Sequence, residues 1–305
     1  NYWKDYEHTF MLWSPIVKSP QKASAHSQVK DVEEIVSTLQ QKNVKVSAIN
    51  SSRRREDMHQ FFVDRDQIGT EYITITGEDV KHIKNVLRMK EGEEVRISDG
   101  VGGDFFCTIE KVTSEEVLAK ILPKEAGNTE LPNRIFLFQA VPKGERMEYV
   151  IQKAVELGVY EIIPVEMKYC VVRLDDKKKE KKRERWQAIA KSAAKQAKRS
   201  RIPEIHPVMS YDKAVEYAKN CQLCLVPYEN ERGMKGTREV LKKIEPGMDI
   251  SVMIGPEGGF SEEEIEMVRE EMEVLSLGKR ILRTDTAAIT VMSMLMLEIE
   301  MKEEE

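Results

Sequence analysis

Two glycine-bearing loops near the C-terminus constrain the fold of this chain more than any other feature. The first loop is residues 255–259 (GPEGG) and the second loop is residues 277–284 (LGKRILRT); each follows an apolar run and precedes a segment with helical patterning. Glycine has no Cβ, so such a backbone can approach a flat ligand closely. In α/β sheets, ligands bind beyond the carboxyl ends of neighbouring strands. Two loops about twenty residues apart therefore predict one ligand site between strand ends.

Strand and helix patterns alternate over residues 130–305. A capping box, in which Glu264 follows Ser261 by three positions, marks the start of one helix, and Gly158 marks the end of another. Strands are predicted at 134–138, 161–165, 223–226, 250–254 and 274–277, and helices at 145–157, 178–200, from 261 onward and 286–301. This order is typical of a mostly parallel sheet with helices on both faces.

Residues 58–129 carry a mostly β pattern. Alternating apolar residues predict strands at 61–63, 72–75, 94–97, 105–109 and 117–121. One short helix fits residues 77–89, with His82, Val86 and Leu87 spaced for one face. The pattern predicts a small β-barrel, and residues 123–132 are interpreted as the linker to the second domain.

Residues 1–57 differ from the rest, because they lack a clean periodicity and begin without methionine. The arginine pair before Glu56 can be encoded by AGG-AGG, a bacterial ribosome-binding sequence, just upstream of Met58. We therefore expect residues 1–57 to be a non-native extension read in frame, with Met58 as the natural start. N-terminal mass spectrometry that finds a native protein beginning earlier would contradict this. The alternative is a genuine, weakly ordered extension.

The composition excludes a membrane-spanning protein and favours a cytoplasmic one. No apolar run approaches the roughly 18 residues of a spanning helix, and the N-terminus has no secretory pattern. A length of 305 residues predicts two domains. The lone CxxC of Cys221 and Cys224 lacks the second pair or the histidines of a zinc site, so buried strand thiols are the favoured interpretation.

Basic residues form one block in an otherwise acidic chain. The net charge is −5, yet residues 177–201 hold twelve Lys and Arg against two Glu, a balance of +10. Residues 256–305 hold five Lys and Arg against fourteen acidic residues, a balance of −9. The basic block predicts a phosphate-binding face, and its alternative is a solvated helix or loop.

Several separated motifs resemble those of one known family. They are residues 82–88 (HIKNVLR), 143–148 (KGERME), 152–158 (QKAVELG), 185–187 (RWQ) with Gln196, 201–205 (RIPEI) and the two glycine loops. In this order and spacing, residues 58–305 resemble the bacterial 16S ribosomal RNA uridine-N3 methyltransferases of the SPOUT superfamily. Two positions depart from the family pattern, since Gln60 stands where arginine is common and Asp285 where glutamate is common.

The resemblance implies a fold and a reaction. The implied fold is α/β, with a PUA-like, RNA-binding β-barrel over residues 58–129 and a SPOUT methyltransferase domain over residues 130–305, whose parallel sheet carries a trefoil knot. The implied reaction is methylation of a uridine N3 in 16S ribosomal RNA, within the small ribosomal subunit, by S-adenosylmethionine. The family works as a homodimer and needs no metal.

The resemblance also assigns the glycine loops to the cofactor, and it adds the turn after residues 225–229 as a third wall. The implied cofactor-binding residues are Leu225, Pro227, Glu229, Gly255, Pro256, Glu257, Gly258, Gly259, Leu277, Gly278, Ile281 and Leu282. Taken alone, Gly258-Gly259 is better explained as a plain turn before a helix. Beside the second loop, that alternative is the weaker one.

Methylation at uridine N3 requires that the proton carried by N3 at neutral pH be removed or shared. The base must be unpaired, and a nearby cation favours its deprotonated form. Arg283 and Arg280 are the candidates for this catalytic role; their alternative is pairing with a phosphate or with the cofactor carboxylate. Methylation at carbon-5 would instead need a cysteine nucleophile, and Cys107 and Cys170 lie in apolar runs without an activating base.

RNA contact is expected to be largely electrostatic. The candidate RNA-binding residues are Arg65, Arg88, Lys143, Arg146, Arg173, Lys195, Arg199 and Arg201. Arg65 is the candidate to replace the arginine missing at position 60. Trp186 is able to stack on a base, but its apolar neighbours at near-helical spacing favour core packing.

Two other functions remain open from the sequence. A ribose 2′-O-methyltransferase of the same fold would use the same cofactor, and a deletion strain would then lack ribose-methylated uridine. A non-catalytic ribosome-assembly factor would bind RNA with a degenerate pocket, and calorimetry would detect no binding of S-adenosylmethionine. The intact glycine loops count against this second alternative.

Overall fold

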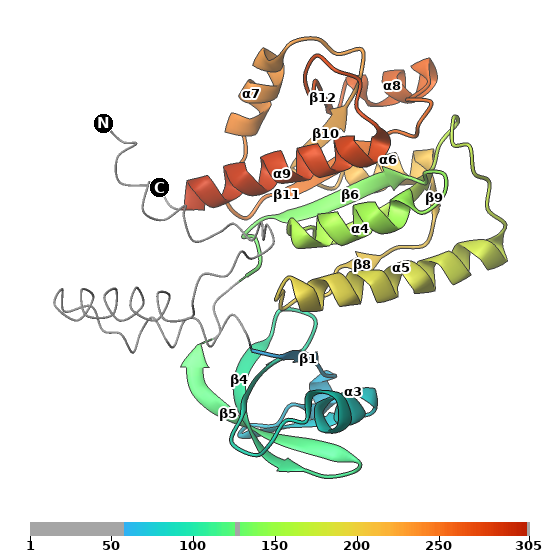
Figure 1. The fold of residues 1–305 in the computed structure, drawn as a ribbon. Helices are drawn as coiled ribbons and strands as arrows, with labels where there is room; N and C mark the ends of the chain where they lie inside the picture. The colour runs from blue at the N-terminus through green and yellow to red at the C-terminus, as the bar shows by residue number, and fades with distance from the viewer. Residues whose placement is uncertain (1–57, 126–128, 304–305) are drawn as a thin grey trace, which may run out of the picture. The chain divides into compact units, whose positions relative to one another are not determined.

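A computed structural model describes residues 58–125 and 129–303, and His59–Glu305 form one compact unit. The predictions for residues 1–57 lie outside the described residues. Two β-sheets organise the unit, a five-stranded sheet in its first part and a seven-stranded sheet in the remainder (Figure 1).

The first sheet has the strand order β1-β3-β4-β5-β2. The elements are β1 (Gln60–Phe62), η2 (Arg65–Gln67), β2 (Tyr72–Thr76), α3 (Glu78–Lys81), η3 (His82–Leu87), β3 (Glu94–Ser98), β4 (Asp104–Val112) and β5 (Glu116–Glu125). β1 pairs parallel with β3 and the other pairs are antiparallel. All five predicted strands are present. Because no pairing joins β1 to β2 among residues 58–125, the sheet is a half-barrel around buried Phe61, Ile73 and Ile97.

The helix predicted for residues 77–89 exists, but its predicted face is wrong. Val80 and Ile83 are buried, whereas Val86 is 66% exposed and His82 is exposed. The helix begins as α3 and continues as the π-helical turn η3. The i→i+5 hydrogen bonds of a π turn rotate later side chains away from the α-helical spacing, so the expected common face is not formed.

The second sheet has seven strands, all paired in parallel as the alternating pattern predicts. The order is β12-β10-β11-β6-β7-β8, and β9 also pairs with β7. The strands are β6 (Arg134–Ala140), β7 (Glu161–Glu166), β8 (Glu204–Ile205), β9 (Met209–Ser210), β10 (Leu223–Pro227), β11 (Asp249–Ile254) and β12 (Glu273–Leu275). Because they all point the same way, their carboxyl ends meet at one edge of the sheet.

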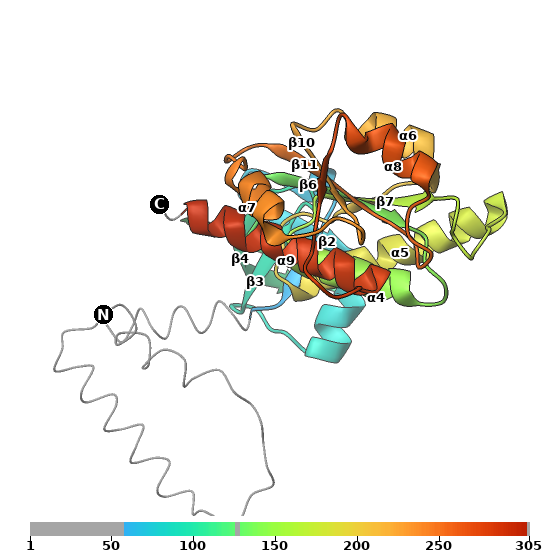
Figure 2. The ribbon, with the colours of Figure 1, turned by 90° about the horizontal axis from the view of Figure 1, so that it is seen from above.

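Helices cover both faces of the second sheet (Figure 2). One face carries α4 (Arg146–Glu156), α5 (Asp176–Gln196), α7 (Met234–Lys242) and α9 (Thr284–Glu303), and the other carries α6 (Tyr211–Ala218) and α8 (Glu262–Arg269). Two of these helices, α6 and α7, were not predicted from the sequence. α6 buries four residues at helical spacing, a signal that was present, whereas α7 contains Gly236 and buries only two residues. Within the described residues, no helix is long and apolar enough to cross a membrane.

The chain after α5 contacts the first sheet. Gln60 Nε2 donates to the carbonyl oxygen of Arg199 over 2.8 Å, and Arg201 Nη2 donates to the carbonyl oxygen of Val101 over 2.7 Å. Trp186, on α5 itself, is buried in the core of the second sheet, which confirms core packing over base stacking. The C-terminal end of the basic block is therefore held against the first sheet, and Trp186 packs the middle of α5 into the core of the second.

A cluster at the start of β7 makes stability depend on pH. Glu161 Oε2 lies 2.8 Å from His206 Nε2 and accepts a 2.8 Å hydrogen bond from the Tyr217 hydroxyl. Burial raises the pKa of Glu161, but these hydrogen bonds outweigh burial and hold that pKa below its usual value. The hydrogen bond to Glu161 holds the pKa of His206 above its usual value.

We expect the His206 contribution to be complete below its unfolded-state pKa of about 6.5, and to be lost as pH rises through the raised folded-state pKa. The Glu161 contribution is present above its unfolded-state pKa of about 4.3 and is lost as pH falls through the lowered one. Chemical denaturation from pH 5 to 8 should therefore show the wild type losing roughly 0.5–1 kcal/mol relative to His206→Gln. Parallel profiles for the two proteins would contradict this.

Candidate functional site

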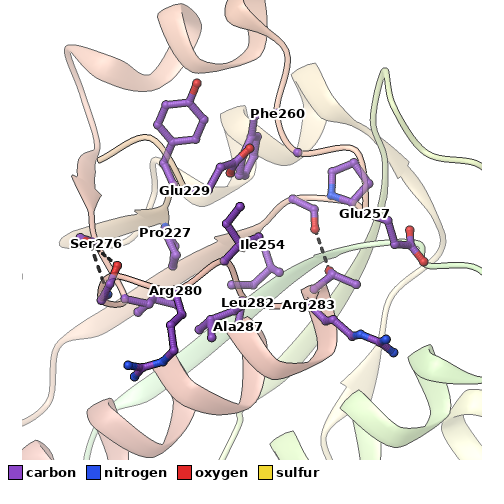
Figure 3. A pocket seen from close by; sticks show the side chains of 18 of the residues that line it. Pro227, Glu229, Ile254, Glu257, Phe260, Ser276, Arg280, Leu282, Arg283 and Ala287 are labelled. Carbon is purple, nitrogen blue, oxygen red and sulfur yellow. Dashed lines mark hydrogen bonds between the residues drawn. The ribbon is translucent and has the colours of Figure 1, made fainter. Parts of the chain in front are cut away.

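A pocket of about 400 Å³ lies where the carboxyl ends of β10, β11 and β12 meet the start of α9 (Figure 3). The turn after β10 and the two glycine loops line it. Of the predicted cofactor-binding residues, only Leu225 and Gly258 lie outside the lining. Further lining residues were not predicted from the sequence as cofactor-binding residues: Tyr228, Arg232, Ile254, Phe260, Ser276, Lys279, Thr284 and Ala287.

The first loop needs glycine because other groups approach its backbone closely. A Cβ on Gly255 would lie 2.9 Å from the Phe260 ring, and one on Gly259 would lie 2.3 Å from Oε1 of Glu229. Gly259 also has a φ of +74°, in the left-handed region that favours glycine. The loop is therefore a packed wall of the pocket, and its role in cofactor binding stays a prediction.

Thr284, the last residue of the second loop and the first of α9, joins the two loops. Its Oγ1 donates to the carbonyl oxygen of Gly255 over 2.7 Å and accepts from Gln139 Nε2 over 2.9 Å. These partners are separated by 29 and 145 positions in the sequence. No local pattern signals such contacts, which is why the sequence analysis missed them.

Charged side chains surround the pocket. Arg280 and Arg283 are both exposed, and their guanidinium groups extend in different directions from the second loop (Figure 3). Glu229 presents its carboxylate to the pocket beside Gly259. The site thus combines a cationic rim with two acidic residues, Glu229 and Glu257.

Glu257 links the first loop to the residues at the start of α4. Its Oε1 accepts a 2.9 Å hydrogen bond from the backbone N–H of Lys143 and a 2.8 Å hydrogen bond from Arg146 Nη1. Its carboxylate lies at the edge of the site, turned away from Ile254 (Figure 3). The carboxylate therefore ties the first loop to the start of α4, a role that the sequence analysis did not anticipate.

The predicted RNA-binding cations divide by exposure. Arg65, Arg88, Lys143 and Arg173 are exposed. Three others are partly buried in contacts, namely Arg146 with Glu257, Lys195 with Asp79 and the Phe61 ring, and Arg201 with Val101 and the Tyr160 ring. Exposure makes this group available for phosphate contact, although Arg65 already pairs with Asp99 over 3.2 Å and Arg173 already donates to the carbonyl oxygen of Lys168 over 3.3 Å.

Arg199 corrects the RNA prediction. It is only 3% exposed, its guanidinium pairs with the Glu130 carboxylate, and its Nη1 donates to the carbonyl oxygens of Val155 and Val159 over 3.1 and 2.7 Å. A guanidinium held in this way serves the core and is not placed to contact a phosphate. Its position within a basic block gave no sign of burial, because charge counts carry no information on tertiary contacts.

The cysteines are poor nucleophiles because burial raises the pKa values of their thiols. Burial, with a further contribution from Asp104, raises the pKa of the Cys107 thiol to about 12. Burial and the neighbouring Cys224 raise the pKa of the Cys221 thiol to about 12. Burial also raises the pKa of the Cys170 thiol. Because the thiolate is the nucleophile, these shifts support the rejection of covalent catalysis.

One group of possible metal ligands occurs among the described residues. Ligand atoms of Glu161, Glu204 and His206 lie within 4.8 Å of one another. The group sits at the start of β7, at the edge opposite the pocket, and Glu161 and His206 already bind each other. This group does not line the pocket. That the activity needs no metal stays a prediction.

The fold and the site place the protein among RNA methyltransferases. Residues 129–296 match the family described as RNA methyltransferase domain, and residues 75–122 match the family described as RNA methyltransferase PUA domain. The first match contains the seven-stranded sheet and the pocket.

Individual relatives narrow this class. Ribosomal RNA small subunit methyltransferase E of Bacillus subtilis is 36% identical over 232 residues, or 75% of this chain and 91% of that protein. The crystal structure of the enzyme of that name from Neisseria gonorrhoeae, bound to S-adenosyl methionine, has a TM-score of 0.65 at 31% identity and covers 78% and 96% of the two chains. A Legionella pneumophila methyltransferase solved with bound SAM has a TM-score of 0.67 at 35% identity and covers 79% and 97%.

The chain belongs to the ribosomal RNA small subunit methyltransferase E family. These matches confirm the predicted fold class, an α/β methyltransferase domain preceded by a PUA-like domain. The trefoil knot stays a prediction.

We expect Gly259→Ala to lower the free energy of unfolding by about 1–2 kcal/mol, because it adds strain at a positive φ and a clash with Glu229. Gly236→Ala is the matched control, since nothing lies within 4 Å of its added Cβ within α7. That variant should be neutral or stabilised by about 0.5–1 kcal/mol. Urea denaturation measures both, and equal effects would contradict the prediction.

Proposed function

We propose that this protein transfers a methyl group from S-adenosylmethionine to N3 of a uridine in 16S ribosomal RNA of the small subunit. The observation that carries the proposal is the glycine-walled pocket at the joined ends of β10, β11 and β12. The similarity to ribosomal RNA small subunit methyltransferase E supports the substrate class. The cytoplasmic location expected from the sequence is part of this proposal, because ribosomal subunits are the partner.

The pocket residues fit the cofactor. The absence of a Cβ on Gly255 and Gly259 makes room for the Phe260 ring and the Glu229 carboxylate, which line the pocket beside them. Ile254 and Leu282 add apolar walls, and the Glu229 carboxylate suits a ligand with a positive sulfonium. The cofactor brings the activated methyl group, and the protein contributes orientation and electrostatics. Relatives solved with bound S-adenosylmethionine support this assignment.

The chemical task of the protein is to stabilise uridine without its N3 proton. Arg280 and Arg283 stand at the pocket rim, and a positive charge beside the base lowers the pKa of N3. Such fixed charge is effective because it is in place before the reaction begins. A base paired through N3 cannot present this atom, so the target nucleotide must be unpaired or flipped.

We propose that the exposed cations Arg65, Arg88, Lys143 and Arg173 contact RNA phosphates. Phosphate contacts position the RNA without reading its sequence. Selection of one uridine would then depend on RNA shape and on the flipped base. This division suits a substrate presented by a folded ribosomal subunit.

We expect the protein to act as a homodimer through α4 and α9, which pack together. Tyr149 on α4 and Leu297 and Met301 on α9 are 49%, 51% and 57% exposed, and exposed apolar side chains on adjacent helices are typical of an interface. Leu297→Glu should convert a dimer to monomer in sedimentation velocity runs. A wild type that sediments as a monomer would contradict the proposal.

The decisive assay is methyl transfer from labelled S-adenosylmethionine to purified small subunits and to naked 16S RNA, followed by nucleoside analysis. We expect 3-methyluridine as the labelled product. Labelled 2′-O-methyluridine would support the ribose methyltransferase instead. Absence of both transfer and calorimetric binding of the cofactor would support the non-catalytic RNA-binding factor.

Arg283→Ala should lower kcat by about 10²-fold, the scale of losing one charge-stabilising group, with little change in cofactor affinity. The defect should shrink as pH rises, because the base then loses its proton without help. Arg283→Lys keeps the charge and should recover part of the rate, and Arg280→Ala tests the second candidate in the same way. A defect that is independent of pH and accompanied by weakened cofactor binding would indicate pairing with the cofactor carboxylate.

A further inference from the structure

Gln139 is a polar residue buried among apolar neighbours in β6. It lies near the end of β6, where Ile135 and Leu137 on the same face belong to the core beneath α9. Its exposure is 0%, and its Oε1 has no hydrogen-bond partner among the described residues. An unpaired buried acceptor lowers stability, so packing alone does not explain a glutamine at this position.

The partners of Gln139 fix the direction of its hydrogen bonds. Nε2 lies 3.0 Å from the carbonyl oxygen of Ala140 and 2.9 Å from Thr284 Oγ1. A carbonyl oxygen only accepts, so the amide nitrogen must face this pair. Thr284 therefore accepts from Gln139 and uses its single hydroxyl hydrogen on the carbonyl oxygen of Gly255, over 2.7 Å.

This chain of bonds connects the three segments that meet at the pocket. Gln139 pairs with Ile254 in the β6–β11 register, and Gly255 follows Ile254 as the first residue of the first loop. Thr284 is buried and ends the second loop. Both loops are thus tied through one hydroxyl to a central strand of the sheet.

We propose that Gln139 and Thr284 are positioning residues that hold the two glycine loops at the spacing required for cofactor binding. The part concerning the cofactor rests on the proposed function. The link between the loops does not, because its bonds form within the protein itself. Neither side chain is assigned a chemical step.

The first sheet supplies a matched arrangement outside the pocket. Gln60 is buried, donates through Nε2 to Ser98 Oγ over 2.9 Å, and also has an unpaired Oε1. Ser98 Oγ in turn donates to Asp104 Oδ1 over 2.9 Å. None of these three residues lines the pocket. Gln60→Leu therefore reports the general effect of deleting a buried glutamine-to-hydroxyl bond.

The link is tested first in the cofactor-free protein by hydrogen exchange. The amide of Gly259 reports on the first loop through its bond to Pro256, and that of Ala287 reports on the end of the second loop through its bond to Arg283. Thr284→Val keeps the side-chain shape and removes the hydroxyl, so both amides should exchange about tenfold faster. Thr284→Ser keeps the hydroxyl and should exchange like the wild type, and Gln60→Leu should leave both amides unchanged.

Calorimetry with S-adenosylmethionine tests the consequence for binding. Thr284→Val should weaken Kd about tenfold, Thr284→Ser should restore it, and Gln60→Leu should lower Tm without changing Kd. Gln139→Leu should weaken Kd as well, and the double variant with Thr284→Val should be no worse than Thr284→Val alone, because both act through one chain of bonds.

If the amides of Gly259 and Ala287 exchange at wild-type rates in folded Thr284→Val, the proposal that Thr284 links the two loops is wrong. Faster exchange with an unchanged Kd would overturn the role in cofactor binding. A wild-type protein that shows no binding of S-adenosylmethionine would instead overturn the proposed function, and the exchange data would still decide whether the loops are linked.

Discussion

The parallel pairing of β10 with β11 and β12 is the constraint on which the rest of the site depends. Parallel strands place all their carboxyl ends at one edge, so the chain leaves the sheet repeatedly at the same place. Three segments distant in sequence are thereby stacked around one pocket. An antiparallel neighbour would send one of these loops to the opposite edge. The glycine content of the loops then becomes useful, because crowded backbones leave little room for side chains.

Features that cost stability locally occur in and beside the pocket. Gly259 needs a positive φ, Gln139 leaves an acceptor unpaired, and Ile281 is 88% exposed in the second loop. Elsewhere, two apolar cores pack on the two faces of the sheet and stabilise the scaffold. Strain and unmet polar groups tend to persist where a rigid surrounding structure holds them for function. Such features are not confined to this edge, since Gln60 and Asn133 also leave buried acceptors unpaired among the described residues.

The arginine and lysine side chains fall into two groups: some bond to other parts of the structure and some remain exposed. Arg199 and Arg201 belong to the structure, because they bond to Glu130 and to backbone carbonyls. Arg88 and Lys143 remain exposed, and Arg88 is held in a left-handed conformation at the end of the π turn. A surface that binds RNA therefore cannot be inferred from the density of Lys and Arg alone. Part of the basic block serves to attach the first sheet to the second.

The sequence by itself determined the alternation of strands and helices, the division into a β part and an α/β part, and the two loops that line the pocket. These are local signals, since periodicity and glycine act within a few residues. It did not identify Val80 and Ile83 as the buried residues of the helix that contains the π turn, and it placed buried Arg199 on the surface. Only the tertiary structure decided which cations stay free and that Gln139 and Thr284 join the loops. These outcomes depend on contacts between residues up to 145 positions apart, which no local pattern encodes.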